Sequence, residues 1–385
     1  MILVTGADGY VGWPLMLKLS KTYPNERIVG VDHFGRRKWV EEIGSVSAIP
    51  IASMEKRLES ARKHGMNNLS FVKEDLTNYE KVCQILQTFR PRVILHTAAQ
   101  PAAPYSHVHA PLANFTQENN NRMCRNLLWA IRELGMEEDT HLVETTTTGV
   151  YGAPNFPIPE GYIEVKTDQG MDLLPYPGLA TSWYHMSKMH DINNLSLASR
   201  LWELTVTDVR TAIVFGTGTK ETRLDPDLAT RFDFDFYFGV VANRFCAQAL
   251  AGHPITLYGK GEQRKPMISL EDAVRSLVKA VELPRHKTMK VYNQMTVLAS
   301  PKELAEAIQK ATGNQGIQTE VTHLPNPRKE NETHQMEMKN EGFLQDLLPD
   351  GASLPLQDEM EEMIRDLKPY QSVFVHYRDR FMQVE

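Results

Sequence analysis

Short apolar runs alternate with segments of helical length through the first half of the chain. The runs cover residues 2–5, 28–32, 69–72, 93–97, 141–145 and 205–209. Each run has the length of a strand, and the segment after it is long enough for a helix that returns the chain to the starting edge of a sheet. The alternation predicts an α/β fold with a doubly wound parallel sheet of the Rossmann type.

The pattern changes after Phe215. Residues 216–262 are rich in charged and aromatic side chains, and an irregular polar stretch covers residues 314–340. The chain has 385 residues, more than one dinucleotide-binding domain requires. We therefore expect such a domain over residues 1–215, with returning elements near 266–294, and mainly a smaller C-terminal substrate lobe over residues 216–385.

Three glycines spaced three apart follow the first predicted strand directly: Gly6, Gly9 and Gly12. In a strand–turn–helix unit, the first glycine permits a tight turn and the second lets the backbone approach a pyrophosphate. The third lets the helix pack close to the strand, so that its free N–H groups point at the phosphates. A glycine-rich turn without a ligand is the alternative, but strand, glycines and helix stand in the order that a dinucleotide site requires.

The second predicted strand ends in Asp32, twenty residues after Gly12. From this position a carboxylate accepts hydrogen bonds from an adenosine ribose, which favours NAD over NADP. Arg36 and Arg37 follow closely and leave pairing with a 2′-phosphate open as an alternative. In such sheets the ligand lies beyond the carboxyl ends of the strands. The residues predicted at these ends are Gly6, Asp32, Asp75, Ala98, Ala99 and Thr147.

Residues suited to chemistry concentrate at the end of the fifth predicted strand, around Thr147, and between Tyr184 and Lys188. Positions four apart share one face of a helix, so Tyr184 and Lys188 project side by side. A lysine ammonium lowers the pKa of a neighbouring phenol from its usual value of about 10. With a hydroxyl from Thr147 on the same oxygen, the phenolate removes a proton from a carbinol while NAD takes the hydride. A fortuitous pair on a helix surface is the alternative for Tyr-x-x-x-Lys alone.

Composition and charge narrow the possible partners. The formal net charge of −6 argues against a nucleic-acid or anionic-membrane surface, because both bind basic patches. The three cysteines are widely spaced and predict reduced core thiols in a cytoplasmic protein, with the plastid stroma as an alternative. The sequence contains no run of about eighteen apolar residues, so it predicts no membrane-spanning helix. We expect no nucleic-acid or membrane partner and no metal.

The glycine pattern, the strand-end threonine and Tyr-x-x-x-Lys resemble the extended short-chain dehydrogenase/reductases of the nucleotide-sugar epimerase/dehydratase family. Within that family the chain is most similar to the UDP-sulfoquinovose synthase group, over roughly residues 2–334. The segments that carry the closer resemblance are Gly12-Trp-Pro, Pro50-Ile-Ala-Ser, Ala103-Pro-Tyr-Ser, Gln117-Glu-Asn-Asn, Tyr151-Gly-Ala-Pro-Asn, Leu174-Pro-Tyr-Pro, Tyr184-His-Met-Ser-Lys-Met-His-Asp, Glu221-Thr-Arg, Asn243-Arg-Phe, Gly252-His-Pro-Ile-Thr-Leu-Tyr-Gly-Lys-Gly and Pro325-Asn-Pro-Arg-Lys-Glu.

The resemblance implies roles for individual residues. The implied NAD site comprises Gly6, Gly9, Gly12, Asp32, Asp75 and Leu76, with Asn119 as a further candidate; Ala98 joins it from its place at a predicted strand end. It implies catalysis by Thr147, Tyr184 and Lys188, with His185 either an acid or base or part of the wall. A nucleotide-diphosphate sugar, with UDP favoured, would be held by Asn243, Arg244, Gln263 and Arg328; an arginine in a proline-framed loop suits a diphosphate.

Several positions depart from that group's pattern. Val150 stands where the sulfoquinovose enzymes carry an acid, and Pro101 stands where they carry an arginine; neither can hold sulfite or move a proton at carbon 5. Lys265 replaces a common arginine, for which Arg264 could compensate. Thr148-Gly149 replaces the Asp-Glu pair of the dehydratases, which argues against loss of the 6-hydroxyl.

The oxidation step is unaffected by these departures. We expect a NAD-dependent enzyme that forms a transient 4-keto hexose, related to UDP-sulfoquinovose synthase but with an altered substrate. A 4-epimerase is the alternative, and a non-catalytic NAD-binding regulator is a third. We also expect a homodimer, because two helices with apolar residues at helical spacing could build a four-helix bundle. The residues expected there are Leu127, Leu128, Ile131, Leu195 and Leu197.

Overall fold

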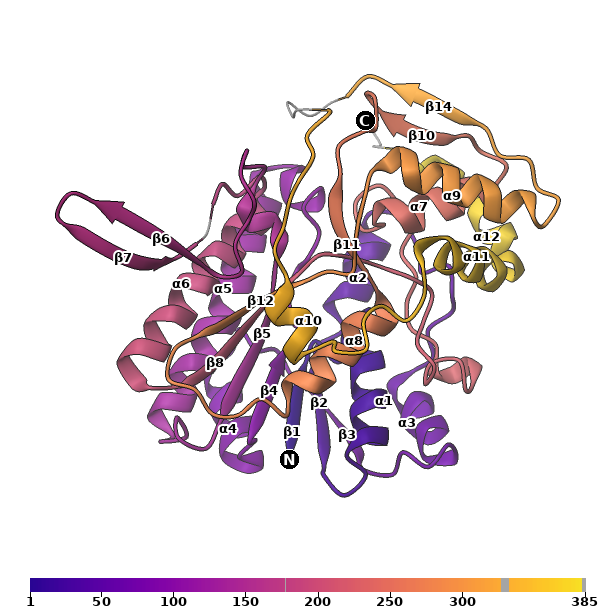
Figure 1. Ribbon diagram of the computed structural model, residues 1–385. Helices are drawn as coiled ribbons and strands as arrows, with labels where there is room; N and C mark the ends of the chain where they lie inside the picture. Colours follow the sequence, from indigo (N-terminus) through magenta and orange to yellow (C-terminus); the bar gives the residue numbers. More distant parts are fainter. Residues whose placement is uncertain (177, 327–331, 383–385) are drawn as a thin grey trace.

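The computed structural model describes residues 1–176, 178–326 and 332–382 (Figure 1). At its centre lies a sheet of seven strands in the order β12-β8-β5-β4-β1-β2-β3, with every neighbouring pair parallel. The strands are β1 (Ile2–Thr5), β2 (Ile28–Asp32), β3 (Leu69–Lys73), β4 (Val93–His96), β5 (His141–Thr147), β8 (Thr205–Thr211) and β12 (Lys290–Gln294). All six predicted strands are present, and the predicted α/β Rossmann fold is confirmed.

Helices cover both faces of this sheet (Figure 1). They are α1 (Gly12–Thr22), α2 (Gly35–Glu42), α3 (Met54–Lys63), α4 (Tyr79–Phe89), α5 (Ala110–Glu133), α6 (Trp183–Trp202) and α8 (Leu270–Ala280). Polar side chains fix several of their starts: Asn78 caps α4, Ser182 caps α6 and Ser269 caps α8, each accepting a hydrogen bond from the first turn. Such caps are typically worth about 1 kcal/mol each.

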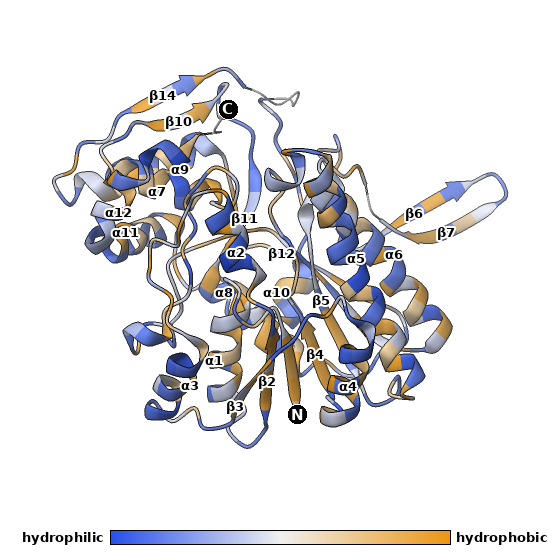
Figure 2. Cartoon of the chain, turned by 180° about the vertical axis from the view of Figure 1, so that it is seen from behind, coloured by the Kyte–Doolittle hydropathy of each residue, from blue (hydrophilic) through white to orange (hydrophobic). Residues whose placement is uncertain are grey.

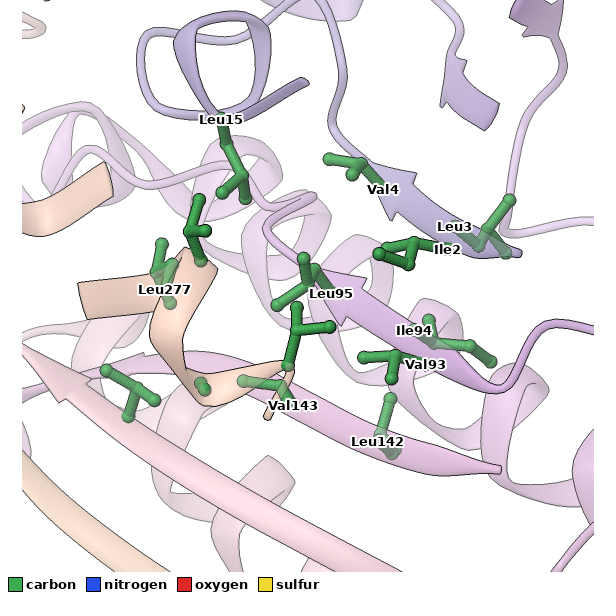
Figure 3. Close-up of a cluster of buried hydrophobic side chains, with 14 of the residues drawn as sticks. Ile2, Leu3, Val4, Leu15, Val93, Ile94, Leu95, Leu142, Val143 and Leu277 are labelled. Carbon is green, nitrogen blue, oxygen red and sulfur yellow. The ribbon is translucent and has the colours of Figure 1, made fainter. Parts of the chain in front are cut away.

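The core of the sheet is formed by the apolar runs themselves. Figure 3 shows side chains of β1, β4 and β5 meeting Leu15 of α1 and Leu277 of α8. All the residues that it labels are buried. Burying one such aliphatic side chain contributes about 1.5–3 kcal/mol, so these residues drive the sheet and its helices together.

A second lobe with its own core follows β8. It contains two small sheets, one of β9 (Ile213–Phe215), β11 (Lys265–Ser269) and β13 (Val297–Ala299), the other of β10 (Ile255–Tyr258) and β14 (Val321–Leu324). Its helices are α7 (Val241–Leu250), α9 (Pro301–Gly313), α11 (Leu356–Leu367) and α12 (Gln371–His376), while α10 (Glu341–Asp346) lies near β12. The chain returns to the central sheet through α8 and β12 (Figure 1).

A hairpin of β6 (Tyr162–Thr167) and β7 (Gly170–Pro175) projects from the body beyond α6, as Figures 1 and 2 both show. Its two strands pair with each other and with no other described strand. Met171 and Leu173 on β7 are 61% and 65% exposed.

The residues predicted to form a dimer contact on α5 and α6 are mostly buried within the subunit. Leu127, Leu128, Ile131 and Leu195 are buried in the subunit's own core and cannot contact a second copy. Of the five predicted contacts, Leu197 alone is exposed, at 46%. Helical spacing identified an apolar stripe correctly, but that stripe is buried within the subunit. No described helix is long and apolar enough to cross a membrane.

Candidate active site

A cleft of about 1360 Å³ lies at the carboxyl ends of the central strands, between the sheet and the second lobe. It is lined by every described residue that the sequence assigned to a site. These are Gly6, Gly9, Gly12, Asp32, Asp75, Leu76, Ala98, Asn119, Thr147, Tyr184, His185, Lys188, Asn243, Arg244 and Gln263. Arg328 lies outside the described residues. Residues more than two hundred positions apart in the chain thus share one cavity.

The glycine loop between β1 and α1 has room for backbone only. Gly6 has a φ of +71°, and a Cβ added there would lie 2.7 Å from the Ala98 nitrogen. A Cβ on Gly9 or Gly12 would lie 2.9 Å or 2.0 Å from the Gly6 carbonyl oxygen. The loop therefore curls tightly at the start of α1 and leaves a cradle beside that helix's N-terminus, a fit for the pyrophosphate of a dinucleotide.

Asp32 lies at the end of β2 with its carboxylate fixed by the backbone. It accepts hydrogen bonds from the Asp8 nitrogen at 3.0 Å and from the Phe34 nitrogen at 2.7 Å. The two arginines beyond it already have carboxylate partners: Arg36 pairs with Asp233 at 2.8 Å, and Arg37 pairs with Asp8 at 2.6 Å. Because both guanidinium groups are paired with carboxylates, the structure does not support the alternative that Arg36 and Arg37 bind the 2′-phosphate of NADP.

We expect NAD to bind at least tenfold more tightly than NADP. A phosphate on the ribose would meet the negative charge of Asp32, while the two nearby cations are occupied by Asp8 and Asp233. Calorimetric titration with both cofactors measures the ratio, and Asp32→Ser should reduce it. Tighter binding of NADP by the parent protein would contradict the role of Asp32 and point to Arg36 and Arg37.

Tyr184 and Lys188 lie one turn apart on α6, which begins at the Ser182 cap beside the cleft. The Lys188 ammonium points inward and is 2% exposed. It contacts Glu144 Oε1 at 3.0 Å and Asp191 Oδ2 at 3.6 Å. The helical face predicted for the pair is present, with the lysine turned toward two buried carboxylates.

The electrostatics of Tyr184 correct the simple expectation from the sequence. Burial raises the pKa of the Tyr184 phenol above its usual range, and the charges of Asp191 and Glu144 raise it further. Lys188 acts in the opposite direction and lowers this pKa, as predicted, but its charge does not outweigh burial.

Thr147 and His185 complete the wall around Tyr184. Thr147 ends β5, and its hydroxyl oxygen accepts a hydrogen bond from the Gly149 nitrogen at 3.1 Å. His185 Nδ1 lies 3.0 Å from the Thr181 hydroxyl, and its ring packs against Tyr184. A Cβ on Gly149 would lie 2.2 Å from His185 Nε2, so this imidazole fits only because residue 149 is glycine.

The second lobe supplies polar groups to the opposite wall. Asn243 and Arg244 are buried on α7, and Gln263 is buried just before β11. Lys265 also lines the cleft. Arg264 does not: it donates to the Leu298 carbonyl at 2.7 Å and pairs with Glu303 at 3.3 Å, so the expected compensation by Arg264 is not supported.

The two positions that depart from the sulfoquinovose enzymes have different surroundings. Val150 is fully buried in the core and is absent from the residues that line the cleft. Pro101 lines the cleft but offers neither a side-chain donor nor a charge. Neither residue can bind an anion or carry a proton.

Sequence reasoning missed the two carboxylates behind Lys188. One signal was Glu144, an acid within the buried strand β5. The other was spacing, because Tyr184, Lys188 and Asp191 stand at positions i, i+4 and i+7 and so share one face of α6. The partnership of Glu144 with Lys188 joins two elements forty-four residues apart, which periodicity within one helix does not reveal.

Known proteins resemble this chain over most of its length. The family model described as "NAD dependent epimerase/dehydratase family" matches residues 2–293. UDP-sulfoquinovose synthase of Sulfolobus acidocaldarius is 37% identical over 376 residues, which are 96% of this chain and 93% of that protein. The chloroplastic UDP-sulfoquinovose synthase of Spinacia oleracea is 36% identical over 340 residues, 88% of this chain and 70% of that protein.

Solved structures share the fold. UDP-glucuronic acid 4-epimerase from Bacillus cereus, in complex with UDP-glucuronic acid and NAD, superposes with a TM-score of 0.70 at 21% identity. The match covers 96% of this chain and 99% of that one. The predicted family, the predicted similarity to the UDP-sulfoquinovose synthase group and the predicted NAD cofactor are confirmed. The chain is a member of the NAD dependent epimerase/dehydratase family.

Proposed function

We propose that this protein oxidises carbon 4 of the hexose in a UDP-sugar, uses the transient ketone to change the sugar, and then returns the hydride. One observation carries the proposal: Tyr184, Lys188 and Thr147 line the same cleft as the glycine loop and Asp32. A binding-only protein would not need a phenol, an ammonium and a hydroxyl at the cofactor cleft. We therefore set aside the non-catalytic regulator.

The chain's own residues account for the proton transfer. The Tyr184 phenolate takes the proton of the 4-hydroxyl as the carbon–hydrogen bond gives up its hydride, and the Thr147 hydroxyl donates a hydrogen bond to the same oxygen. When bound, NAD supplies the hydride acceptor and, in its oxidised form, a positively charged ring. On return of the hydride, Tyr184 gives the proton back to the sugar oxygen, which leaves the enzyme unchanged.

The second lobe is the proposed site of the nucleotide diphosphate. Asn243, Arg244 and Gln263 line the cleft from the second lobe, whereas the glycine loop lines it from the central sheet. Amide and guanidinium donors suit diphosphate oxygens and a pyrimidine base. UDP is favoured because the similar curated proteins are UDP-sulfoquinovose synthases. Arg328 is proposed for the same role on the resemblance alone.

The fate of the ketone separates two candidates. Similarity to the sulfoquinovose synthases favours a change at carbon 5 or 6, but Pro101 lines the cleft without a charge and Val150 is buried outside it, so neither side chain offers an anion site or a proton acceptor. We therefore propose an altered substrate for this member of the group. A 4-epimerase is the second candidate, since rotation of the ketone before reduction requires no group beyond Tyr184, Lys188 and Thr147.

Incubating the NAD-loaded protein with UDP-, GDP- and dTDP-hexoses, with and without sulfite, tests both. We expect turnover of a UDP-sugar and no sulfite-dependent gain of mass. A product of unchanged mass with a new stereocentre identifies an epimerase. Incorporation of sulfite would contradict the inference from Val150 and Pro101, and no conversion of any sugar would contradict the proposed function.

We further propose a cytoplasmic homodimer. Cys83, Cys124 and Cys246 are free, which supports a reducing compartment. The proposed interface is the outer surface of α5 and α6, where Trp129, Leu197 and Leu201 are exposed. Exposed apolar groups clustered on adjacent helices are typical of contact surfaces.

Leu197→Arg combined with Leu201→Arg is expected to shift the protein from dimer toward monomer. Both substitutions place a charge in the proposed apolar contact without disturbing the core. Sedimentation velocity over a hundredfold range of concentration measures the change. Leu344→Arg, at a partly exposed leucine on α10, is the matched control and should leave the dimer intact. A parent protein that is monomeric at every concentration would contradict the dimer.

A further inference from the structure

The Lys188 ammonium belongs to a buried charge cluster that the proposed reaction does not by itself require. Glu144 of β5 contacts it at 3.0 Å, and Asp191 of α6 contacts it at 3.6 Å. All three side chains are almost completely buried. The other Asp191 oxygen accepts a hydrogen bond from Asn121 of α5 at 2.8 Å. Side chains of β5, α6 and α5 thus form one buried network that includes Lys188.

In the described part of the chain, the other side chains that contact Lys188, Glu144 or Asp191 add no second cation. His96 of β4 lies 4.0 Å from Glu144, and burial lowers the pKa of its imidazole to about 3, so the ring is neutral. Its Nδ1 is occupied by the Thr5 hydroxyl at 2.6 Å. Cys124 of α5 faces Glu144, and burial raises the pKa of that thiol. His185 packs against Tyr184, and the Asp208 carboxyl of β8, which pairs with Arg210 at 2.8 Å, is a further charge near Glu144.

We propose that Glu144 and Asp191 are positioning residues, which hold the Lys188 ammonium on the inner side of α6 and set the charge that the Tyr184 phenol experiences. The inference rests on the proposed function in that Tyr184 is taken as the base. It adds a role for two acids that the reaction does not touch. Both contact Lys188, both act on the phenol through their charge, and neither lines the cleft.

Charge balance explains why two acids matter. One ammonium and two carboxylates carry a net charge of −1, which is costly in a buried site unless a proton is shared. Burial raises the pKa of both carboxyl groups, and that of Asp191 to about 6. A proton shared with either carboxyl group leaves the cluster neutral, one helical turn from Tyr184.

The sign of each effect on the phenol follows from Coulomb's law. The positive charge of Lys188 lowers the pKa of Tyr184, and the negative charges of Asp191 and Glu144 raise it. Removing a carboxylate should therefore lower the phenol pKa, whereas removing the ammonium should raise it. A purely structural role predicts no movement in either direction.

The test is direct titration of Tyr184 in the NAD-saturated protein, with tyrosine ¹³C-labelled at the ring and the resonance assigned by its loss in Tyr184→Phe. We expect Glu144→Gln and Asp191→Asn each to lower the phenol pKa by about one unit, a tenfold change in proton affinity. Lys188→Met should raise it. The Gln and Asn oxygens can still accept the bonds from Lys188 and Asn121, so the geometry is largely kept.

Glu160→Gln is the matched control. Glu160 is a partly buried carboxylate that accepts hydrogen bonds from the Asn293, Gly342 and Phe343 nitrogens, and it does not contact Lys188. Its loss should lower the melting temperature and leave the Tyr184 pKa unchanged. If Glu144→Gln fails to fold, Asp191→Asn and Glu144→Asp provide the same measurement.

An unchanged phenol pKa in folded, NAD-binding Glu144→Gln and Asp191→Asn would overturn the inference. The titration needs no sugar, so it gives an answer even if the protein converts none of the UDP-sugars offered. Once a substrate is identified, the acid limb of the kcat profile should move in the same directions as the phenol pKa.

Discussion

Tyr184→Phe should lower turnover by roughly 10²–10⁴-fold, which is the usual contribution of one positioned acid–base group. The affinity for NAD should be nearly unchanged. The substitution removes the hydroxyl and keeps the ring that packs against His185. Steady-state assay of the responsive UDP-sugar gives kcat, and calorimetry gives the affinity for NAD. Thr147→Val should cost less, because it removes a hydrogen bond and not the proton acceptor.

Tyr162→Phe is the matched control for this experiment. The Tyr162 hydroxyl donates to the Met289 carbonyl at 2.8 Å, away from the residues that line the cleft. The Tyr162→Phe substitution should leave kcat unchanged. A folded Tyr184→Phe protein that binds NAD and turns over at near the parent rate would remove the reason for regarding the chain as a tyrosine-dependent enzyme.

Gly12→Ala should also have a large effect, on the affinity for NAD and not on the proton transfer that Tyr184→Phe removes. The new Cβ would lie 2.0 Å from the Gly6 carbonyl oxygen, and the backbone must move to relieve the clash. Overpacking of this kind typically costs about 1–3 kcal/mol, and here it would shift α1 away from the phosphate cradle. We expect NAD affinity to fall by about a hundredfold or more, together with a lower melting temperature.

Gly313→Ala provides the comparison. Gly313 ends α9 in the second lobe, and a Cβ added there meets no atom within 4 Å. NAD affinity should be unchanged in this variant. Equal affinity in Gly12→Ala and the parent would show that the loop binds the dinucleotide in another way.

The fold was predictable because its signals are local. Strands β1, β2 and β4 consist almost entirely of apolar residues, and the glycines of the first turn follow one another at intervals of three residues. Gly6, Asp32 and Tyr184 lie at strand or helix ends, where topology alone brings them to one edge of the sheet. Their meeting in one cleft followed from the order of elements.

The remaining features depend on contacts between distant segments. Leu127 and Leu195 follow a helical period that is the same whether the stripe faces the sheet or a second subunit, so the sequence could not choose between them. The inward turn of Lys188 depends on Glu144, on another element. Likewise, the sequence leaves a phosphate-binding role open for Arg36 and Arg37. The structure argues against that role because Asp233 and Asp8 pair with them.

The hairpin of β6 and β7 also marks where this chain can be lengthened. Asp168 and Gln169 link its strands at a point where neither the central sheet nor either core is in contact. Six-residue strands carry that turn about 20 Å from its base. Exposed turns of this kind accept inserted sequence with little loss of stability. A fluorophore or an affinity tag built into it would report on the enzyme from a distance, without entering the cleft.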